Sequence, residues 1–189
     1  RVEQQHFAVR KRTLEYDDVM NKQRSVVYEL RGRVLTGDAE TVHNLVLDVM
    51  NDLVLTQSER YLFDEKDGSL ADFMNWLGVT FPITITEDDV RPFMGAPDKA
   101  GEFVMKRVEE AYETKCSGED PAMLPYMERA VFLQVIDREW QDFLRAMDDL
   151  RTGVNLRAYG QRDPLVEYKK EAFFMFETLM TSVKTKVVS

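Results

Sequence analysis

The feature that most constrains the fold is a run of thirty residues, 2–31, that contains neither glycine nor proline. Apolar residues recur in and just after this run at steps of three and four residues: Tyr16, Val19, Met20, Val27, Leu30 and Val34. This spacing predicts one long helix, which at about 1.5 Å per residue would span roughly 45 Å. The apolar stripe is not a strict heptad of leucine and isoleucine, so we favour a strut packed against other domains over a self-dimerising coiled coil.

The next part of the chain predicts one helix followed by a shorter one. Apolar residues between Val42 and Val54 recur at helical steps, and Asp38 precedes them as a candidate N-cap. Further on, Ser69 precedes a second periodic segment, 70–77, and Gly78 follows it where a C-terminal cap belongs. We therefore expect the second helix to end at Gly78.

Two more helices are expected before residue 121. Thr86 is followed by Glu87, Asp88 and Asp89, and acidic side chains favour the positive end of a helix dipole. We interpret this run as the capped start of a helix and not as a catalytic cluster. Apolar residues between 103 and 112 predict a further helix, which the breaker residues 117–121 would close.

The last part predicts two antiparallel helices that pack face to face. Apolar residues recur at helical steps in a segment from about 126 to 150 and again in a return segment from 172 to 187. We expect Trp140 and the cluster Phe173, Phe174 and Phe176 to form the core of this pair and not a cofactor pocket. The whole chain is thus expected to be all-α: a long helix, 1–36, a small helical domain, 37–121, and a two-helix finger, 122–189.

The connection between the two last helices, 152–164, is expected to be a loop because it contains glycine and proline. It also carries Leu156 and Tyr159, where a purely solvated turn would be polar, and three arginines, 151, 157 and 162, surround them. Exposed apolar residues at such a tip indicate a contact with another molecule. The spacing equally allows these two side chains to fold back onto the helices, and both alternatives stay open.

Charge is distributed unevenly along a chain whose net charge is −9. Residues 1–36 carry eight basic and five acidic side chains, residues 37–121 seven and nineteen, and residues 122–189 ten of each. The acidic middle part would repel phosphates, so we do not expect nucleic acid as a partner. No window approaches the roughly 18 apolar residues of a membrane-spanning helix. Since the chain starts with arginine and not methionine, we also expect it to be a piece of a longer protein.

The sequence offers little support for catalysis. None of its nine glycines lies in a phosphate-binding loop followed by lysine and serine or threonine. His6 and His43 lack a nucleophile or metal-ligand partner at motif spacing, and the single cysteine, Cys116, has no cysteine or histidine neighbours for a zinc site. We therefore expect no catalytic residues, no cofactor and no metal in this chain, and a reducing, cytosolic setting.

Two motifs resemble the SecA family of bacterial preprotein translocase motors. The first is RKRTLEYDDV at residues 10–19, similar to the long helix of that family's scaffold domain. The second is AMDDLRTG at 146–153 followed by LRAYGQRDP at 156–164, similar to its two-helix finger, and EYK at 167–169 and FMF at 174–176 continue the match. The acidic middle part corresponds in position to the helical wing domain, where the match is mainly Phe81-Pro82-Ile83.

The resemblance implies a non-catalytic part of an ATP-driven translocase, whose ATP, Mg²⁺ and nucleotide-binding motifs belong to the parent protein. Implied partners are the motor domains of the same protein, the SecY channel and the unfolded preprotein, with a homodimer of the parent left open. The implied location is cytoplasmic, on the inner face of the bacterial plasma membrane. By the same resemblance, Tyr159 at the finger tip contacts the moving polypeptide, with Leu156 and Arg157 beside it, and the cluster Arg10, Lys11 and Arg12 faces a motor domain.

Two alternatives lead to different experiments. A free-standing helical adaptor would use Leu156 and Tyr159 as a docking knob for a folded partner, and it would keep its function without an attached motor. An uncharacterised hydrolase would need a pair of histidine or carboxylate side chains brought together in a pocket by the fold.

Overall fold

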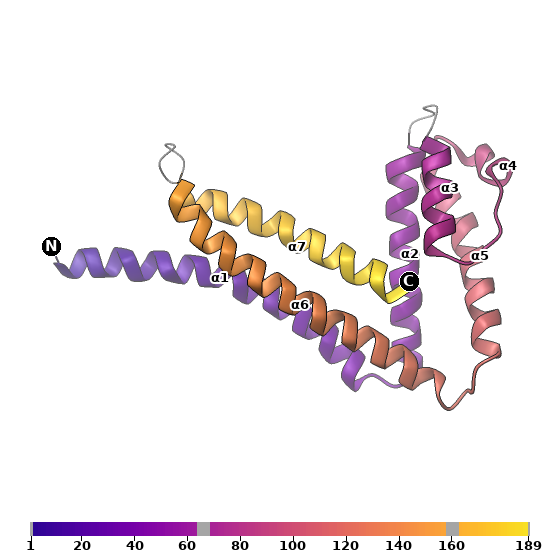
Figure 1. The fold of residues 1–189 in the computed structure, drawn as a ribbon, viewed down its shortest axis with the longest axis horizontal. Helices are drawn as coiled ribbons and strands as arrows, with labels where there is room; N and C mark the ends of the chain where they lie inside the picture. Colours follow the sequence, from indigo (N-terminus) through magenta and orange to yellow (C-terminus); the bar gives the residue numbers. More distant parts are fainter. Residues whose placement is uncertain (1, 64–68, 158–162, 189) are drawn as a thin grey trace. The chain divides into compact units, whose positions relative to one another are not determined.

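A computed structural model describes residues 2–63, 69–157 and 163–188. These residues form helices joined by short connections, and they contain no strand (Figure 1). Their order is α1 (Val2–Thr36), α2 (Ala39–Leu62), α3 (Ser69–Thr80), α4 (Glu87–Val90), the 3₁₀ turn η1 (Arg91–Phe93), α5 (Pro97–Ser117), α6 (Leu124–Arg157) and α7 (Pro164–Val188). The expected all-α class is confirmed.

The residues group into two compact units, which we describe separately. The three-helix unit consists of Arg1–Leu35 and Leu133–Val183, and the wing unit consists of Thr36–Phe132 and Lys184–Ser189. The predicted domain boundaries at residues 36 and 121 stay a prediction, because grouping by contacts does not test where a domain begins.

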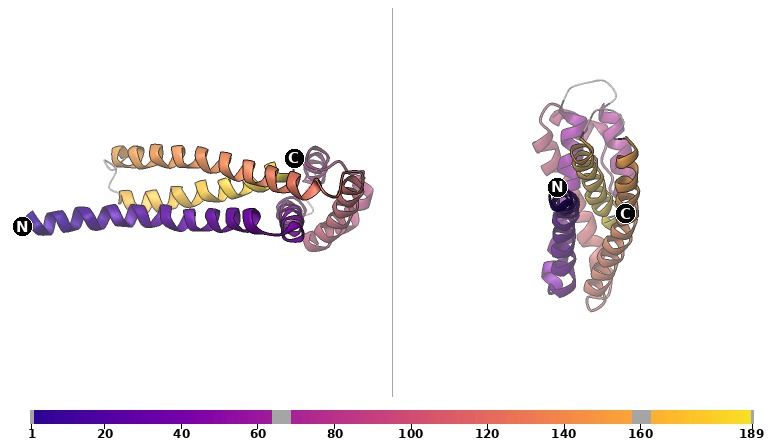
Figure 2. Two further views of the ribbon diagram at one scale, coloured as in Figure 1. Left: turned by 90° about the horizontal axis from the view of Figure 1, so that it is seen from below. Right: turned by 90° about the vertical axis from the view of Figure 1, so that its left-hand side faces the viewer.

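In the three-helix unit, α1 packs along α6 and α7 (Figures 1 and 2). Pairs that join α1 to α6 show that these two helices are antiparallel, since Asp17 meets Arg151 whereas Arg31 meets Asp137. Between α6 and α7, Phe143 meets Phe176, and Glu139 accepts a hydrogen bond from Ser182. The apolar side chains buried along these helices form its core: Tyr16, Val27, Val34, Ile136, Trp140, Phe143, Met147, Leu150, Val154, Tyr168, Ala172, Leu179 and Val183.

In the wing unit, α2 packs against α3 and α5, and its buried residues follow the predicted spacing. Helix α5 lies close to α2 at Gly101, where an added Cβ would lie 2.6 Å from Cδ2 of Leu55. Gly95 takes a φ of 76°, a conformation that glycine adopts without strain, and its N–H donates to the carbonyl of Leu62. These two glycines let the segment before α5 turn and let α5 lie close to α2.

Two predicted helix starts are confirmed in detail. The side chain of Asp38 accepts a hydrogen bond from the N–H of Thr41 and caps α2. Hydrogen bonding with the side chain of Thr41, and then with its backbone, lowers the pKa of Asp38. Before α4, Thr86 and Asp89 form a capping box, in which the Asp89 carboxylate accepts from the N–H and the hydroxyl of Thr86. Both carboxylates therefore serve helix ends.

Three expectations about the ends and faces of helices are wrong. Helix α3 continues past Gly78 to Thr80, and α6 continues through Gly153 to Arg157, so the loop does not begin at residue 152. Glycine inside a helix costs only about 1 kcal/mol, which buried neighbours such as Val154 offset. Phe173 and Phe174 are not core residues, since they are 57% and 54% exposed. Consecutive helical residues lie about 100° apart, so a run such as 173–176 cannot share one face.

Candidate functional site

The expected finger-tip residues fall at the edge of what the structure describes. Tyr159 lies outside the described residues. Leu156 and Arg157 belong to the last turn of α6, and their side chains are not described. Arg10 and Lys11 are exposed on α1. The contacts that hold the helix ends on either side of the tip are described, and we take this end of the three-helix unit as the candidate site.

Asp163 fixes the start of α7. Its Oδ1 atom accepts a hydrogen bond from the N–H of Leu165 at 2.9 Å, and its carbonyl accepts from the N–H groups of Val166 and Glu167. The same Oδ1 pairs with Nη2 of Arg12 at 3.2 Å. Both side chains are largely exposed, so the pair adds little stability, but it joins α1 to the residue where α7 begins. Arg12 therefore has a partner within its own unit.

A cluster of aromatic and charged side chains joins α1, the C-terminal part of α6 and the N-terminal part of α7. The rings of Tyr16 on α1 and Tyr168 on α7 lie 4.7 Å apart between centroids, and both residues are buried, 8% and 1% exposed. Arg151 of α6 donates to Oδ1 of Asp17 at 3.2 Å, and its guanidinium carbon lies 5.9 Å from the centre of the Tyr16 ring. Burial raises the pKa of Tyr168 above its ordinary value. We call Tyr16, Asp17, Arg151 and Tyr168 the tyrosine cluster.

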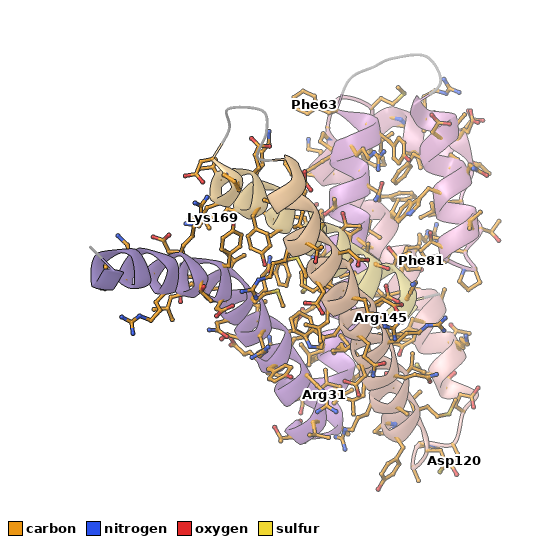
Figure 3. The ribbon with its side chains drawn as sticks, turned by 60° about the vertical axis from the view of Figure 1, so that its left-hand side comes forward. Arg31, Phe63, Phe81, Asp120, Arg145 and Lys169 are labelled. Atoms are coloured by element: carbon orange, nitrogen blue, oxygen red, sulfur yellow. The ribbon has the colours of Figure 1, made fainter. Side chains whose placement is uncertain are left out.

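Two polar contacts join α1 to the pair farther along its length. Nε2 of Gln23 donates to the carbonyl of Ala172 at 2.9 Å in a buried position. Arg31 forms a two-pronged pair with Asp137 at 2.7 and 3.2 Å, on the face where α1 and α6 meet (Figure 3). A bidentate pair fixes orientation as well as distance. The long helix is thus fastened to both helices of the pair at several levels.

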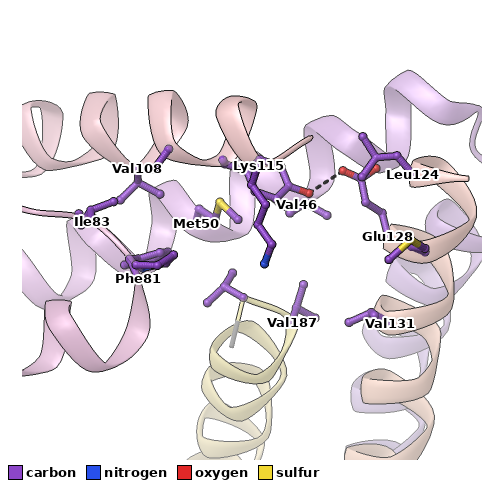
Figure 4. A pocket seen from close by; sticks show the side chains of 15 residues that line it. Val46, Met50, Phe81, Ile83, Val108, Lys115, Leu124, Glu128, Val131 and Val187 are labelled. Carbon is purple, nitrogen blue, oxygen red and sulfur yellow. Dashed lines mark hydrogen bonds between the residues drawn. The ribbon is translucent and has the colours of Figure 1, made fainter. Parts of the chain in front are cut away.

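The wing unit contains a partly buried polar cluster that sequence reasoning missed. Oε1 of Glu128, at the start of α6, accepts a hydrogen bond from the hydroxyl of Tyr112 at 2.6 Å (Figure 4). The same oxygen lies 2.7 Å from Nδ1 of His43. The rings of His43 and Tyr112 stack with centroids 5.6 Å apart. Burial, then the hydrogen bond to Glu128, raises the pKa of Tyr112, and burial raises that of Cys116 nearby. This cluster joins α2, α5 and α6.

The missed contacts leave only weak signals in the sequence. Tyr112 and Glu128 lie 16 residues apart, whereas the partners of the other missed hydrogen bonds lie 85 to 151 residues apart, and no local pattern reports such distances. The signal that could have found the tyrosine cluster is the motif pair itself, since Tyr16 and Asp17 belong to the first motif and Arg151 to the second.

The described residues offer no arrangement for metal chemistry. No group of three or more histidine, cysteine, aspartate or glutamate side chains in these ranges could hold a metal ion. Among the described residues, no helix is both long enough and apolar enough to cross a bilayer. The contacts of the candidate site hold α1 against α6 and α7.

Comparison with known proteins gives a consistent result. The family model described as SecA Wing and Scaffold domain matches residues 1–189. A Protein translocase subunit SecA from Heliobacterium modesticaldum is 38% identical over 187 residues, which cover 97% of this chain and 22% of that protein. The relatives of the same name from Acidothermus cellulolyticus and Chlorobaculum tepidum are 39% and 35% identical, with 99% and 100% of this chain and 20% and 18% of those proteins covered.

The chain therefore spans about a fifth of the length of these relatives, and its whole length corresponds to one region of them. The three long helices α1, α6 and α7, which contact one another, are compatible with a scaffold region. On this match along its whole length, the chain belongs to the SecA family of protein translocase subunits, in the wing and scaffold domain.

Proposed function

We propose that this chain is the non-catalytic scaffold and finger of an ATP-driven translocase, and that it transmits movement of the motor domains to an unfolded preprotein in the SecY channel. The motor domains would belong to the same protein, and ATP and Mg²⁺ would bind there. The protein would work on the cytoplasmic face of the bacterial plasma membrane, with a second copy of itself as a further partner.

The observation that carries this proposal is the fastening of α1 to α6 and α7. The tyrosine cluster and the Gln23 and Arg31 contacts join the long helix to both others between residues 16 and 31. A displacement of α1 by a motor domain would therefore carry the pair with it, because packed helices deform little. The pair would then pass the displacement to the connection at its end.

On this proposal, Tyr159 contacts the moving polypeptide, with Leu156 and Arg157 as neighbours. An aromatic ring can hold chains of any sequence through apolar and stacking contacts. Arg10, Lys11 and Arg12 would face a motor domain, where their exposed charges find acidic groups.

The experiment compares the intact translocase with its Tyr159→Ala variant in preprotein translocation, basal ATP hydrolysis and channel binding. We expect translocation to fall while the other two activities persist. Tyr126→Ala is the matched control, because Tyr126 is an exposed tyrosine on the first turn of α6. Unchanged translocation would refute the role of Tyr159, and function without any attached motor would indicate an adaptor instead.

A further inference from the structure

The wing unit contains a cavity of about 280 Å³ that the scaffold role does not use (Figure 4). Its walls come from α2, from the segment 81–83, from α5, from the start of α6 and from the last turn of α7. The lining is mainly apolar, with Met50, Phe81 and Val108 on one side and Val187 on another. All these residues belong to one compact unit, so the cavity is a property of that unit alone.

The size of the cavity limits what it can hold. A cavity of about 150 Å³ with apolar walls is enough to bind benzene, so by proportion 280 Å³ admits an apolar body of roughly ten carbon atoms. Two wall residues, Met127 and Val131, remain 48% and 45% exposed, which leaves an apolar entrance. An occupant that covers these side chains would remove apolar surface from water.

The charged side chains that line the cavity limit which polar group an apolar occupant can carry. Lys115 and Glu128 are the charged side chains that line it. Oε1 of Glu128 is already engaged by Tyr112 and His43 at 2.6 and 2.7 Å. Lys115 is exposed, its side chain extends over the cavity in Figure 4, and among the described residues no ion pair is assigned to it. The cavity thus combines apolar walls with the exposed cation of Lys115 and with Glu128, whose Oε1 atom is held by two side chains of the protein itself.

We propose that this cavity binds a small anionic amphiphile, a carboxylate on an apolar chain of about ten carbon atoms, with the carboxylate at Lys115 and the chain between α2, α5 and α7. A cationic amphiphile would meet the ammonium group of Lys115 and be disfavoured. A neutral amphiphile would fill the cavity but would form no ion pair with Lys115. The carboxylate should therefore bind more tightly than the alcohol of equal length by up to about fivefold, the gain typical of a partly exposed ion pair.

The test uses decanoate, decanol and decyltrimethylammonium with the intact protein that contains this chain, labelled with ¹³C at its methionine methyl groups. Met50 and Met127 line the cavity and report binding, whereas Met147, buried in the three-helix unit, serves as the internal reference. Replacing Met50 or Met127 by leucine assigns each signal. We expect decanoate to shift both signals at lower concentration than decanol, and the cationic amphiphile to bind most weakly.

Two substitutions locate the binding. Lys115→Met should abolish the preference for decanoate over decanol, whereas Lys106→Met, an exposed lysine of α5 outside the cavity, should keep it. Ala111→Leu should weaken all three probes because it fills the cavity. Equal affinity for decanoate and decanol, a preference that survives Lys115→Met, or binding unaffected by Ala111→Leu would each overturn the proposal. So would shifts produced by an acidic peptide and not by decanoate.

Discussion

The hydroxyl of Tyr16 leads to a prediction that removing it stabilises the protein. This oxygen is buried at the centre of the tyrosine cluster, and the described residues provide no hydrogen-bond partner for it. A buried hydroxyl without a partner loses its bonds to water on folding, which costs about 1 to 3 kcal/mol. Tyr16→Phe removes the hydroxyl and keeps the ring against Tyr168. We therefore expect the substitution to raise the free energy of unfolding by about 1 kcal/mol.

Urea unfolding followed by tryptophan fluorescence measures this change. The chain has two tryptophans, and Trp76→Phe leaves Trp140 as the reporter of the three-helix unit. With a typical urea dependence of about 2 kcal/mol per molar, the midpoint should rise by about 0.5 M. Tyr28→Phe is the control, since Tyr28 is 55% exposed, and it should change the midpoint little. A midpoint lowered by Tyr16→Phe would show that the hydroxyl is bonded and refute the reasoning.

Three further predictions concern individual side chains. Glu128→Ala should lower the free energy of unfolding of the wing unit by about 1 to 2 kcal/mol, because the partly buried hydroxyl of Tyr112 loses its acceptor. Trp76 fluorescence in urea checks this, and an unchanged free energy of unfolding would contradict it. Gly153→Ala should raise the free energy of unfolding of the three-helix unit by about 0.5 to 1 kcal/mol, since α6 is helical there and an added Cβ meets nothing within 4 Å. A lower free energy of unfolding, measured by Trp140 fluorescence in urea, would indicate instead that Gly153 lies in a loop. The pKa of Asp38 is lowered on folding by its bonds to Thr41, so its contribution is present above the unfolded pKa of about 4 and is lost as pH falls through the lower folded value. The free energy of unfolding should therefore fall less between about pH 5 and about pH 2 in Asp38→Asn than in the unsubstituted protein.

The helices themselves could be predicted from the sequence, because their signals are local. The spacing of apolar residues predicted α1, the position of Asp38 before a periodic segment predicted its cap, and the acidic residues after Thr86 predicted the start of α4. Glycine misled the prediction at Gly78 and Gly153, since its local preference to end a helix is weaker than the packing of the residues around it.

The contacts of the candidate site could not be predicted from any local pattern. Which face of α7 is buried depends on where α1 lies, and so the exposure of Phe173 was missed. The pairing of Arg12 with Asp163 joins residues 151 positions apart, and it followed only from the fold. Family resemblance located the motifs without stating that Tyr16 and Arg151 meet.

The central claim is that α1 moves the α6–α7 pair because the two are fastened together. The most direct test measures preprotein moved per ATP hydrolysed by the intact translocase carrying Tyr168→Ala, which removes a buried ring between α1 and α7. Phe174→Ala is the control, because Phe174 is an exposed aromatic residue of the same helix. We predict that Tyr168→Ala lowers the ratio while ATP hydrolysis continues and that the control leaves it unchanged. An unchanged ratio in Tyr168→Ala would contradict the claim.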